Sequence, residues 1–462
     1  MTDIGAPSVA AAAATAELHE AALRPALKAG RRFWALFIGL GLVAIVGAVA
    51  YGIQLAAGGL SVTGYNDQVF WASYEATLVA FIGFSYGGAL VSAVLRLTNA
   101  SWRGPITRIA EVSALATLLV GALFPIIHLG HPERIWLLFA RPNFQSPIFW
   151  DMVAILTYML ATLILLVLPL IPDSAMLRDQ PGLGRLRRRL YAVLSLGWAG
   201  TQSQRRALER AMTVVAILIV PMAVIVHTVL SYTFSLTSRP GWHSTIFGPY
   251  FVIGAVYSGV AVVILAAVAY RRAYALQRWI DDRTIRNLGY VMVVLGFAYG
   301  YATFSEITTE GFVGKQAEVE LLYGLMLERY APLFWAFIGL GLLAPVALIA
   351  FRRTRTPAGI GLAAGLVIAA MYLKRLLIVV PPLSRPVIAG DAGSYTPSVV
   401  EIAIVSGAAA GVVLIMLFLF RFVPVLAVDE MEQIERVHAD SRMAAGPRPT
   451  KAAVALGDVA DV

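Results

Sequence analysis

Ten long apolar runs, separated by short polar segments, dominate the hydropathy pattern of the 462-residue chain. A membrane-spanning helix needs about 20 mainly apolar residues, and each run meets that length. The predicted spans are 34–58, 70–95, 108–128, 149–171, 211–235, 246–270, 287–310, 332–351, 358–380 and 399–423. The pattern therefore predicts an all-α integral membrane protein with ten transmembrane helices.

The composition agrees with a chain that is solvated mainly by lipid. Apolar residues make up 59% of it and charged residues only 14%, too few to cover the surface of a soluble protein. The chain contains no cysteine, which excludes disulfides, cysteine zinc sites and thiolate-bound iron–sulfur clusters. Any iron–sulfur centre that works with this chain must therefore sit on a partner.

Basic residues fall mainly on one side of the predicted membrane. The amino-terminal arm, the segments after even-numbered spans and the carboxyl tail hold 28 of the 36 lysines and arginines. The opposite side holds Arg134, Arg141, Arg239, Lys315, Arg329 and Arg385, and the ninth span holds Lys374 and Arg375. Because cytoplasmic flanks carry the basic excess, both termini are predicted to be cytoplasmic. Topology accounts for the net charge of +9, so no nucleic-acid partner is predicted.

Ionisable residues inside a bilayer are costly and are functional candidates by default. A first group lies in the outer half of the second to fifth spans and comprises Glu75, His128, His131, Asp151 and His227. Helical spacing puts Tyr86 on the face of Glu75. Carboxylates and imidazoles in an apolar bundle suit the oxidation of a lipid-soluble hydroquinone, whose hydroxyls need proton acceptors. The alternative is that each residue caps a helix or satisfies a neighbour.

The histidines raise two other possibilities. His128 and His131 have a spacing that a metal site uses, but Gly130 and Pro132 end the helix there and no third ligand is close in sequence. A haem b between His128 and His227 is the sharper alternative. A bundle with two b haems needs four mid-helix histidines, whereas this chain has one. No metal and no haem are therefore predicted.

A second polar group follows farther along the chain. Tyr299, Thr303, Glu306 and Glu310 form one stripe on the seventh span, and Lys374 and Arg375 lie in the ninth, followed by Asp391, Tyr395 and Glu401. Such a stripe facing two basic residues fits a proton relay or a static ion-paired network equally well.

Several stretches match the motifs of one family of membrane proteins. They are Gly64-Tyr-Asn-Asp67-Gln with Trp71 and Glu75; Arg96-Leu-Thr-Asn99 with Trp102-Arg103-Gly-Pro105-Ile-Thr-Arg108; His128-Leu-Gly-His131-Pro with Trp136; Arg141-Pro-Asn143 with Ser146-Pro147 and Trp150-Asp151; His227 with Ser231-Tyr232-Thr-Phe; Arg239-Pro-Gly-Trp242-His243-Ser-Thr-Ile-Phe247; and Lys374-Arg375. With this ordered set the chain resembles the integral membrane subunits of the NrfD and polysulfide-reductase family. Within that family it looks most like the ActC subunit of alternative complex III.

The resemblance implies a subunit with two four-helix bundles and flanking helices. The expected parts are a cytoplasmic arm at 1–33, a first helix at 34–58, a quinol-binding bundle at 70–235, a second bundle at 236–380, a last helix at 399–423 and a cytoplasmic tail at 424–462. The implied location is the bacterial cytoplasmic (inner) membrane. The complex would serve respiratory or photosynthetic electron transport.

The resemblance also implies roles for individual residues. His128, His131 and Asp151 would be catalytic, and Glu75, Tyr86, Arg134 and His227 would bind menaquinol or ubiquinol. The proton pathway would use Glu306, Glu310, Lys374, Arg375, Asp391 and Glu401. The chain would hold no haem or iron–sulfur cluster itself. Its implied partners are lipids, a periplasmic iron–sulfur subunit, multihaem cytochrome c subunits and a paralogous NrfD-like membrane subunit.

Three alternative functions stay open at this point. The chain resembles, less closely, the paralogous ActF-type subunit, which is thought not to oxidise quinol. A secondary transporter would bind an ion or substrate at Glu306, Lys374 and Arg375, although no inverted repeat is evident. A third alternative is a structural or proton-conducting anchor for peripheral redox subunits.

Overall fold

The computed structural model describes residues 9–27, 29–180, 183–242, 244–386 and 392–433, and within these ranges it is helical without any strand. The elements are α1 (Val9–Leu27), α2 (Arg31–Ala56), η1 (Leu60–Val62), α3 (Ser73–Leu97), α4 (Gly104–Gly121), α5 (Phe124–His128), η2 (Pro132–Arg134), α6 (Leu137–Ala140), α7 (Pro147–Arg178), α8 (Arg185–Leu194), α9 (Gln202–Ser235), α10 (Phe247–Ala273), α11 (Asp282–Val313), α12 (Gln316–Met326), α13 (Ala331–Ile338), η3 (Gly339–Leu343), α14 (Ala344–Ala350), α15 (Pro357–Leu383) and α16 (Val399–Leu419).

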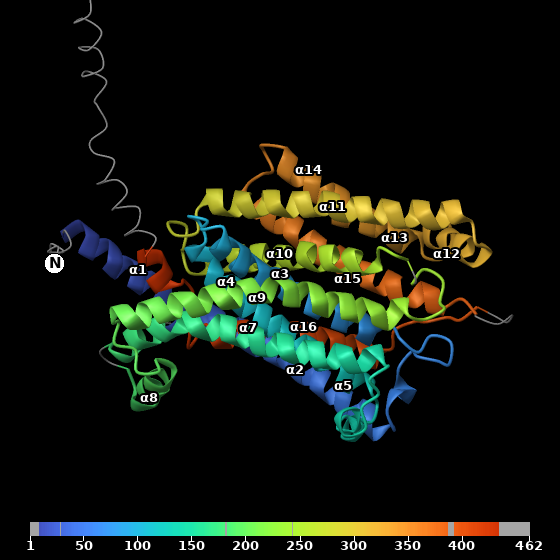
Figure 1. Cartoon of the computed structure of the whole chain (residues 1–462), viewed down its shortest axis with the longest axis horizontal. Helices are drawn as coiled ribbons and strands as arrows, with labels where there is room; N and C mark the ends of the chain where they lie inside the picture. The colour runs from blue at the N-terminus through green and yellow to red at the C-terminus, as the bar shows by residue number, and fades with distance from the viewer. Residues whose placement is uncertain (1–8, 28, 181–182, 243, 387–391, 434–462) are drawn as a thin grey trace, which may run out of the picture.

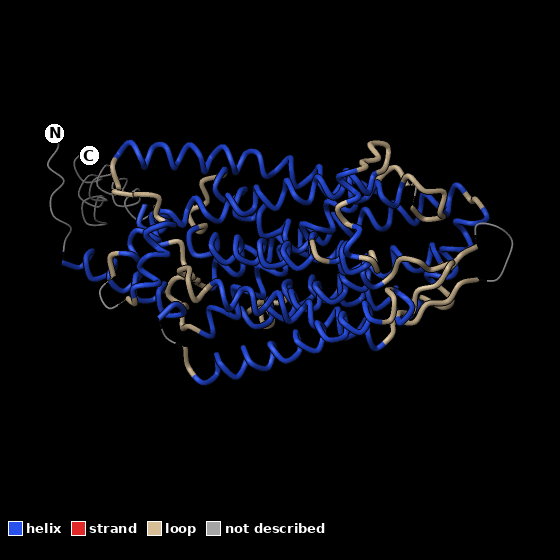
Figure 2. Tube along the Cα trace, turned by 90° about the horizontal axis from the view of Figure 1, so that it is seen from below, coloured by secondary structure: helices blue, strands red, loops and turns tan. Residues whose placement is uncertain are grey.

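Ten helical stretches in the described chain are long and apolar enough to cross a membrane, which confirms the predicted fold class and number of spans. The long helices run side by side along the length of the molecule (Figure 1). Loops gather at the two ends, and helix fills the middle (Figure 2). We call the end that carries α1 and α8 the α1 end, and the end that carries α5 and α12 the α12 end.

Helix α3 lies at the centre of the molecule. It packs against α4, α9, α10 and α15, and 89% of its most apolar stretch is buried. Helix α2 is the opposite case, because it packs chiefly on α16 and leaves Leu42, Ile45 and Val49 exposed. Exposed apolar side chains of this kind are the surface that a membrane protein presents to lipid.

Glycines allow two of these helix pairs to approach closely. A Cβ atom on Gly87 of α3 would collide with the backbone of Gly259 on α10, and one on Gly47 of α2 would come within 2.8 Å of the Gly407 Cα on α16. By contrast, Gly365 on α15 faces open space. Backbone contact replaces side-chain packing at the first two crossings, as is common in membrane bundles.

The segment after α16 turns back under the α1 end. Val425, Leu426 and Val428 are at most 1% exposed, and the Val425 amide donates to the Ala22 carbonyl at 3.1 Å. Glu430 forms an ion pair with Arg96 of α3. The expected tail from residue 424 therefore begins with a buried segment that closes this end of the bundle, and residues 434–462 lie outside the described part.

Candidate functional site

A cavity of about 410 Å³ lies at the α12 end among α3, α5, α7 and α9. Most of its lining is apolar. The lining residues are Trp71, Glu75, Leu78, Val79, Pro125, His128, Leu129, Arg134, Ile135, Leu138, Ile148, Asp151, Met152, Leu230, Thr233 and Phe234. We call it the α3–α7 cavity. An apolar pocket with a few convergent polar groups is the usual form of a small-molecule site.

Glu75 and His128 lie side by side on the wall of this cavity. Glu75 lies in the first turn of α3, where Oε2 accepts the Ala72 amide at 3.1 Å and so satisfies a free helix amide. Its Oε1 lies 2.9 Å from His128 Nδ1. The two groups are close enough for charge attraction, although Nδ1 makes no hydrogen bond within the described residues. A neutral ring with its proton on Nδ1, facing the carboxylate, has Nε2 as a hydrogen-bond acceptor.

The loop after α5 separates His128 from His131. Gly130 ends the short helix with a φ of +71°, a conformation that glycine adopts readily. Beyond it, the His131 side chain is 52% exposed and its Nδ1 lies 3.1 Å from Glu133 Oε1. His131 does not line the cavity, whereas Arg134 reaches its rim with a side chain that is 65% exposed.

Asp151 reaches the cavity from the first turns of α7. Pro147 begins this helix, and Asp151 lies one turn farther in, where it is only 6% exposed. Its Oδ1 atom has no hydrogen-bond partner in the described part of the chain. A buried carboxyl oxygen without a partner is costly. This oxygen is therefore a strong candidate to contact a ligand in the cavity.

Tyr86 and His227 lie deeper in the bundle than the cavity. Tyr86 is eleven residues beyond Glu75 on α3, which corresponds to about 16 Å along the helix axis. Its ring stacks on Tyr158 at 4.6 Å and meets the His227 ring edge to face at 4.2 Å. Neither residue lines the cavity. Both His227 ring nitrogens and the Tyr86 hydroxyl lack partners within the described residues.

Two aromatic residues that were not among the predicted site residues, Tyr65 and Trp71, also belong to the surroundings of this cavity. The Tyr65 hydroxyl donates to Glu75 Oε2 at 3.4 Å. Burial and the nearby Glu75 carboxylate raise the pKa of Tyr65 well above its usual value, so it stays protonated as a donor. Trp71 lines the cavity and stacks on Trp242 at 6.1 Å. Both residues belong to the matched stretch from Gly64 to Glu75, which was the available signal.

The second polar group assembles in part. Lys374 Nζ lies 3.8 Å from Glu306 Oε2 and 5.3 Å from the centre of the Tyr250 ring. Glu306, Glu310 and Lys374 line a small cavity of about 50 Å³ together with Glu318, which the sequence analysis missed. These side chains come from α11, α12 and α15, so the stripe on α11 does face the lysine.

The other members of that group do not line this cavity. Arg375 interacts with Tyr299 of the α11 stripe and lies beside α3, where a Cβ on Gly83 would be 3.4 Å from its Nη2. Glu401 is fully buried and accepts four hydrogen bonds, from the Gly64 and Ser398 amides and the Ser73 and Tyr395 hydroxyls. Asp391 lies outside the described residues.

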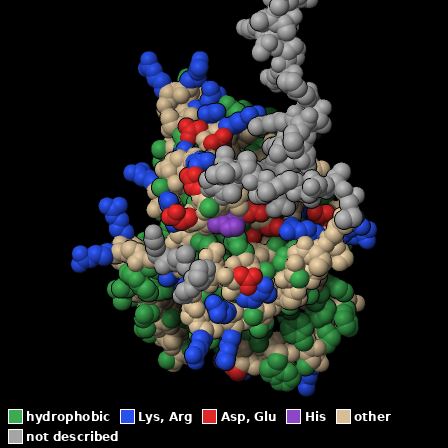
Figure 3. All heavy atoms as spheres, turned by 90° about the vertical axis from the view of Figure 1, so that its left-hand side faces the viewer, with side chains coloured by type: hydrophobic (Ala, Val, Ile, Leu, Met, Phe, Trp, Pro, Cys, Tyr) green, Lys and Arg blue, Asp and Glu red, His purple; other side chains and the backbone are tan. Residues whose placement is uncertain are grey.

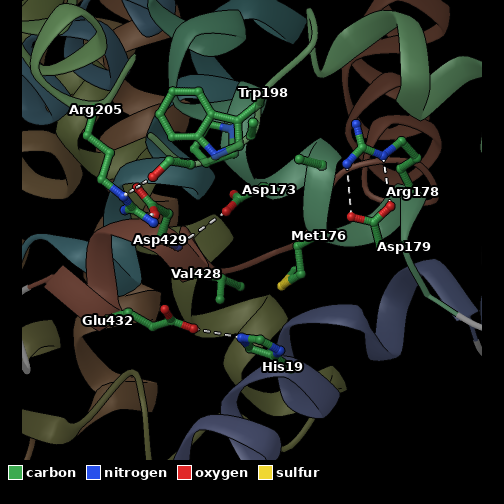
Figure 4. A pocket seen from close by; sticks show the side chains of 14 residues that line it. His19, Asp173, Met176, Arg178, Asp179, Trp198, Arg205, Val428, Asp429 and Glu432 are labelled. Atoms are coloured by element: carbon green, nitrogen blue, oxygen red, sulfur yellow. Dashed lines mark hydrogen bonds and ion pairs between the residues drawn. The ribbon is translucent and has the colours of Figure 1, made fainter. Parts of the chain in front are cut away.

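A polar pocket of about 320 Å³ lies at the α1 end, between α1, α7, the loop before α9 and the segment after α16. Figure 4 shows its charged side chains in pairs, with His19 on Glu432, Arg205 on Asp429 and Arg178 on Asp179. The Asp429 amide also donates to Asp173 at 3.2 Å. Charges that satisfy one another in this way indicate a structural junction. The α3–α7 cavity is therefore the stronger candidate site.

Within the described residues, no group of three or more histidine, aspartate and glutamate side chains has the arrangement of a metal site.

The fold and the cavity define a multi-pass helical membrane protein with a mainly apolar site at one end. The family model described as "Polysulphide reductase, NrfD" matches residues 61–386, and the chain belongs to this family.

Three relatives align with nearly the whole chain. A Halobacterium salinarum protein, provisionally named as a membrane subunit of dimethyl sulfoxide reductase, is 26% identical over 85% of this chain and 91% of its own length. A selenate reductase subunit of Mesobacillus selenatarsenatis is 24% identical over 87% of this chain and 96% of its own. The Hdr-like menaquinol oxidoreductase integral membrane subunit of Archaeoglobus fulgidus is 24% identical over the same shares.

Proposed function

We propose that this chain is the quinol-binding membrane subunit of an oxidoreductase complex and that the α3–α7 cavity holds the quinol headgroup. The observation that carries the proposal is the unpartnered Asp151 oxygen in a mainly apolar cavity that also contains the Glu75–His128 pair. The name of the Archaeoglobus relative, a menaquinol oxidoreductase subunit, supports the choice of ligand. The ligand is menaquinol or ubiquinol.

Oxidation of a quinol releases two protons and two electrons. In the proposed site, His128 Nε2 accepts one hydroxyl proton while Glu75 stabilises the imidazolium from the Nδ1 side. The carboxylate of Asp151 accepts the other proton. Arg134, at the rim, orients the headgroup. The electrons leave for an iron–sulfur centre on a partner subunit, because this chain has no cysteine to ligate one.

The proposed orientation puts the α12 end at the periplasmic face of a bacterial cytoplasmic membrane, with both termini in the cytoplasm. The basic excess near the α1 end supports this orientation. Protons from the quinol are then released outwards, and the iron–sulfur subunit docks over the α12 end. Electrons pass from there to multihaem cytochrome c subunits, as in alternative complex III.

Within the family we propose the ActC-type role, in which the bundle over residues 70–235 oxidises quinol. The stretches that favour this role over the ActF-type role are His128-Leu-Gly-His131 and Trp150-Asp151. They supply His128 and Asp151, which both line the cavity. For the bundle over residues 236–380 we propose a proton pathway through Glu306, Glu310 and Lys374, whose side chains face one small cavity. Static pairing remains the competing role for Glu401, since its carboxylate already accepts four hydrogen bonds.

His128, at the end of α5, and His131, in the loop after it, provide a matched test of the quinol site. His128→Gln removes the acceptor beside Glu75, so we expect quinol oxidation by the purified complex to fall by about a hundredfold or more. His131→Gln changes an exposed side chain that does not line the cavity, and we expect most of the activity to remain. The measurement is steady-state quinol oxidation at equal complex content.

A reversed result, with loss of activity only in His131→Gln, would leave His131 as the catalytic histidine, whereas the resemblance implied that role for both His128 and His131. Asp151→Asn keeps the shape of the side chain but removes its basicity, and we expect the same loss as in His128→Gln. Full activity in both His128→Gln and Asp151→Asn contradicts the proposed site. Absence of bound quinone from the purified complex, at normal assembly, would favour the anchor alternative.

A further inference from the structure

Helix α8 is a short basic helix that connects two spans at the α1 end. It packs against α7 and projects from the side of the bundle (Figure 1). Its helical spacing separates two faces. Leu186, Leu190 and Val193 form a stripe on one face and are 84%, 38% and 71% exposed. A continuous apolar stripe that the rest of the chain leaves exposed marks a surface that contacts a membrane or a protein partner.

The other face holds α8 against the bundle. Tyr191 is 1% exposed, and its hydroxyl donates to the Phe422 carbonyl at 3.0 Å. Arg187 donates to the Ala26 carbonyl at 3.2 Å and lies 5.5 Å from the centre of the Phe422 ring. These contacts fix the rotation of the helix, so its Leu186–Val193 stripe must face outwards.

The contacts of α8 with Phe422 and Ala26 place this helix at the depth in the membrane where the lipid-facing apolar surface of the bundle ends. Phe422 follows α16, whose exposed apolar surface ends at Phe418. Ala26 precedes α2, whose exposed apolar surface begins at Trp34. Residues at these two transitions lie near the boundary between lipid headgroups and hydrocarbon. The α8 stripe therefore lies beside the headgroup region of one leaflet.

Positive charge flanks the stripe. Arg185, Arg188 and Arg189 are exposed, and no hydrogen bond or ion pair engages Arg185 or Arg189 within the described chain. Arg206 and Arg210 add exposed positive charge in the first turns of α9, before its exposed apolar residues begin at Val214. Figure 3, a view onto the α1 end, shows basic side chains projecting around the edge of this face.

We propose that α8 is an interfacial helix that binds anionic phospholipid in the leaflet at the α1 end. Leu186, Leu190 and Val193 enter the boundary of the acyl chains, and Arg185 and Arg189 contact the lipid phosphates. An amphipathic helix with a basic polar face binds anionic membranes through both of these contributions. A guanidinium can also donate two parallel hydrogen bonds to one phosphate group. The proposal does not depend on the quinol site.

The depth of the stripe can be measured directly because the chain has no cysteine to remove. Val193→Cys and Ala192→Cys each provide a single site for a nitroxide label in the full chain. We expect the label at 193, in nanodiscs that contain phosphatidylglycerol, to be accessible to oxygen and protected from a water-soluble nickel chelate. The label at 192, an exposed position outside both the Leu186–Val193 stripe and the packed face of Tyr191, should be accessible to the chelate.

The charge contribution needs a second experiment with a matched control. Arg185→Gln/Arg189→Gln removes two charges from α8, and Arg352→Gln/Arg353→Gln removes two from another exposed loop at the same end. Each arginine near an anionic surface contributes about fivefold to binding. We therefore expect the α8 variant to bind short-chain phosphatidylglycerol about twenty-five-fold more weakly, as measured by native mass spectrometry. The control variant should bind it nearly as tightly as the unmodified chain.

Two results would overturn the proposal. Equal loss of phosphatidylglycerol binding in the two double variants would show a general charge effect with no role for α8. A label at 193 that the nickel chelate reaches in phosphatidylglycerol nanodiscs would show that lipid does not cover the stripe. In that case a protein partner must cover it in the assembled complex.

Discussion

At the residue scale, His128 and Asp151 enter the cavity in different electrostatic surroundings. His128 Nδ1 lies 2.9 Å from Glu75, which is itself held by the Ala72 amide and the Tyr65 hydroxyl. Asp151 has an unpartnered buried oxygen. The Glu75 carboxylate would stabilise a proton on His128. The unpartnered Asp151 oxygen is available to contact a ligand.

The Glu306–Lys374 pair supplies a prediction at the same scale. Both side chains are largely buried, so Glu306→Gln leaves the lysine charge without its partner. Loss of one partner of a buried pair costs about 3–5 kcal/mol. We expect a clear fall in the thermal unfolding midpoint of the detergent-solubilised chain. The double variant Glu306→Gln/Lys374→Met removes both charges and should recover much of that loss.

A double variant as unstable as Glu306→Gln alone would contradict this account of the pair. Proton transfer needs a separate measurement. If the pair belongs to a proton pathway, the stable double variant should oxidise quinol without proton translocation in reconstituted vesicles. Unchanged translocation in that variant would leave the pair with a static structural role.

At the element scale, close helix contact depends on a few positions without side chains. The α3–α10 crossing brings the backbones of Gly87 and Gly259 together, whereas Gly365 on α15 meets no atom within 4 Å. Both Gly87 and Gly365 lie inside apolar spans, and their sequence surroundings do not distinguish them. Only the neighbouring helix determines which of them tolerates a side chain.

Gly87→Ala and Gly365→Ala form a matched pair of variants. The first inserts a methyl group into a backbone contact, and overpacking of this kind costs about 1–3 kcal/mol. The second inserts the same group into open space, so we expect no loss, or a slight gain from the better helix propensity of alanine. The unfolding midpoint of each purified variant is the measurement. Equal midpoints would show that the α3–α10 crossing adapts without strain.

At the scale of the whole molecule, charge asymmetry and the cavity lie at opposite ends. The α1 end carries most of the basic residues and the ion-paired junction around Asp429. The α12 end carries the α3–α7 cavity. The proposed outward release of protons therefore depends on which end faces the periplasm.

Orientation can be tested with the single-cysteine variants Glu133→Cys at the α12 end and Ser203→Cys at the α1 end. Both positions are exposed in the structure. We expect a membrane-impermeant maleimide to label residue 133 in intact cells and residue 203 only after the membrane is opened. The reverse labelling pattern would place the termini outside and contradict the proposed direction of proton release.

The sequence by itself determined the spans and the residues that merit attention. Runs of about 20 apolar residues have few alternatives to a spanning helix, because the bilayer requires every backbone amide to be paired. Ionisable side chains are costly in a bilayer, so the polar residues inside the spans, among them Glu75, Asp151 and Lys374, were evident from the sequence. The matched stretches also indicated the family to which the chain belongs.

Only the tertiary structure decided which of those residues meet. It joined Glu75 to His128 and brought Asp151 to the same cavity, but it left His131 exposed and His227 deeper in the bundle. It also gave the adjacent Lys374 and Arg375 different neighbours, Glu306 for the lysine and Gly83 of α3 for the arginine. The physical reason is that helical spacing fixes a residue's face on its own helix, while the packing of neighbouring helices determines what that face contacts.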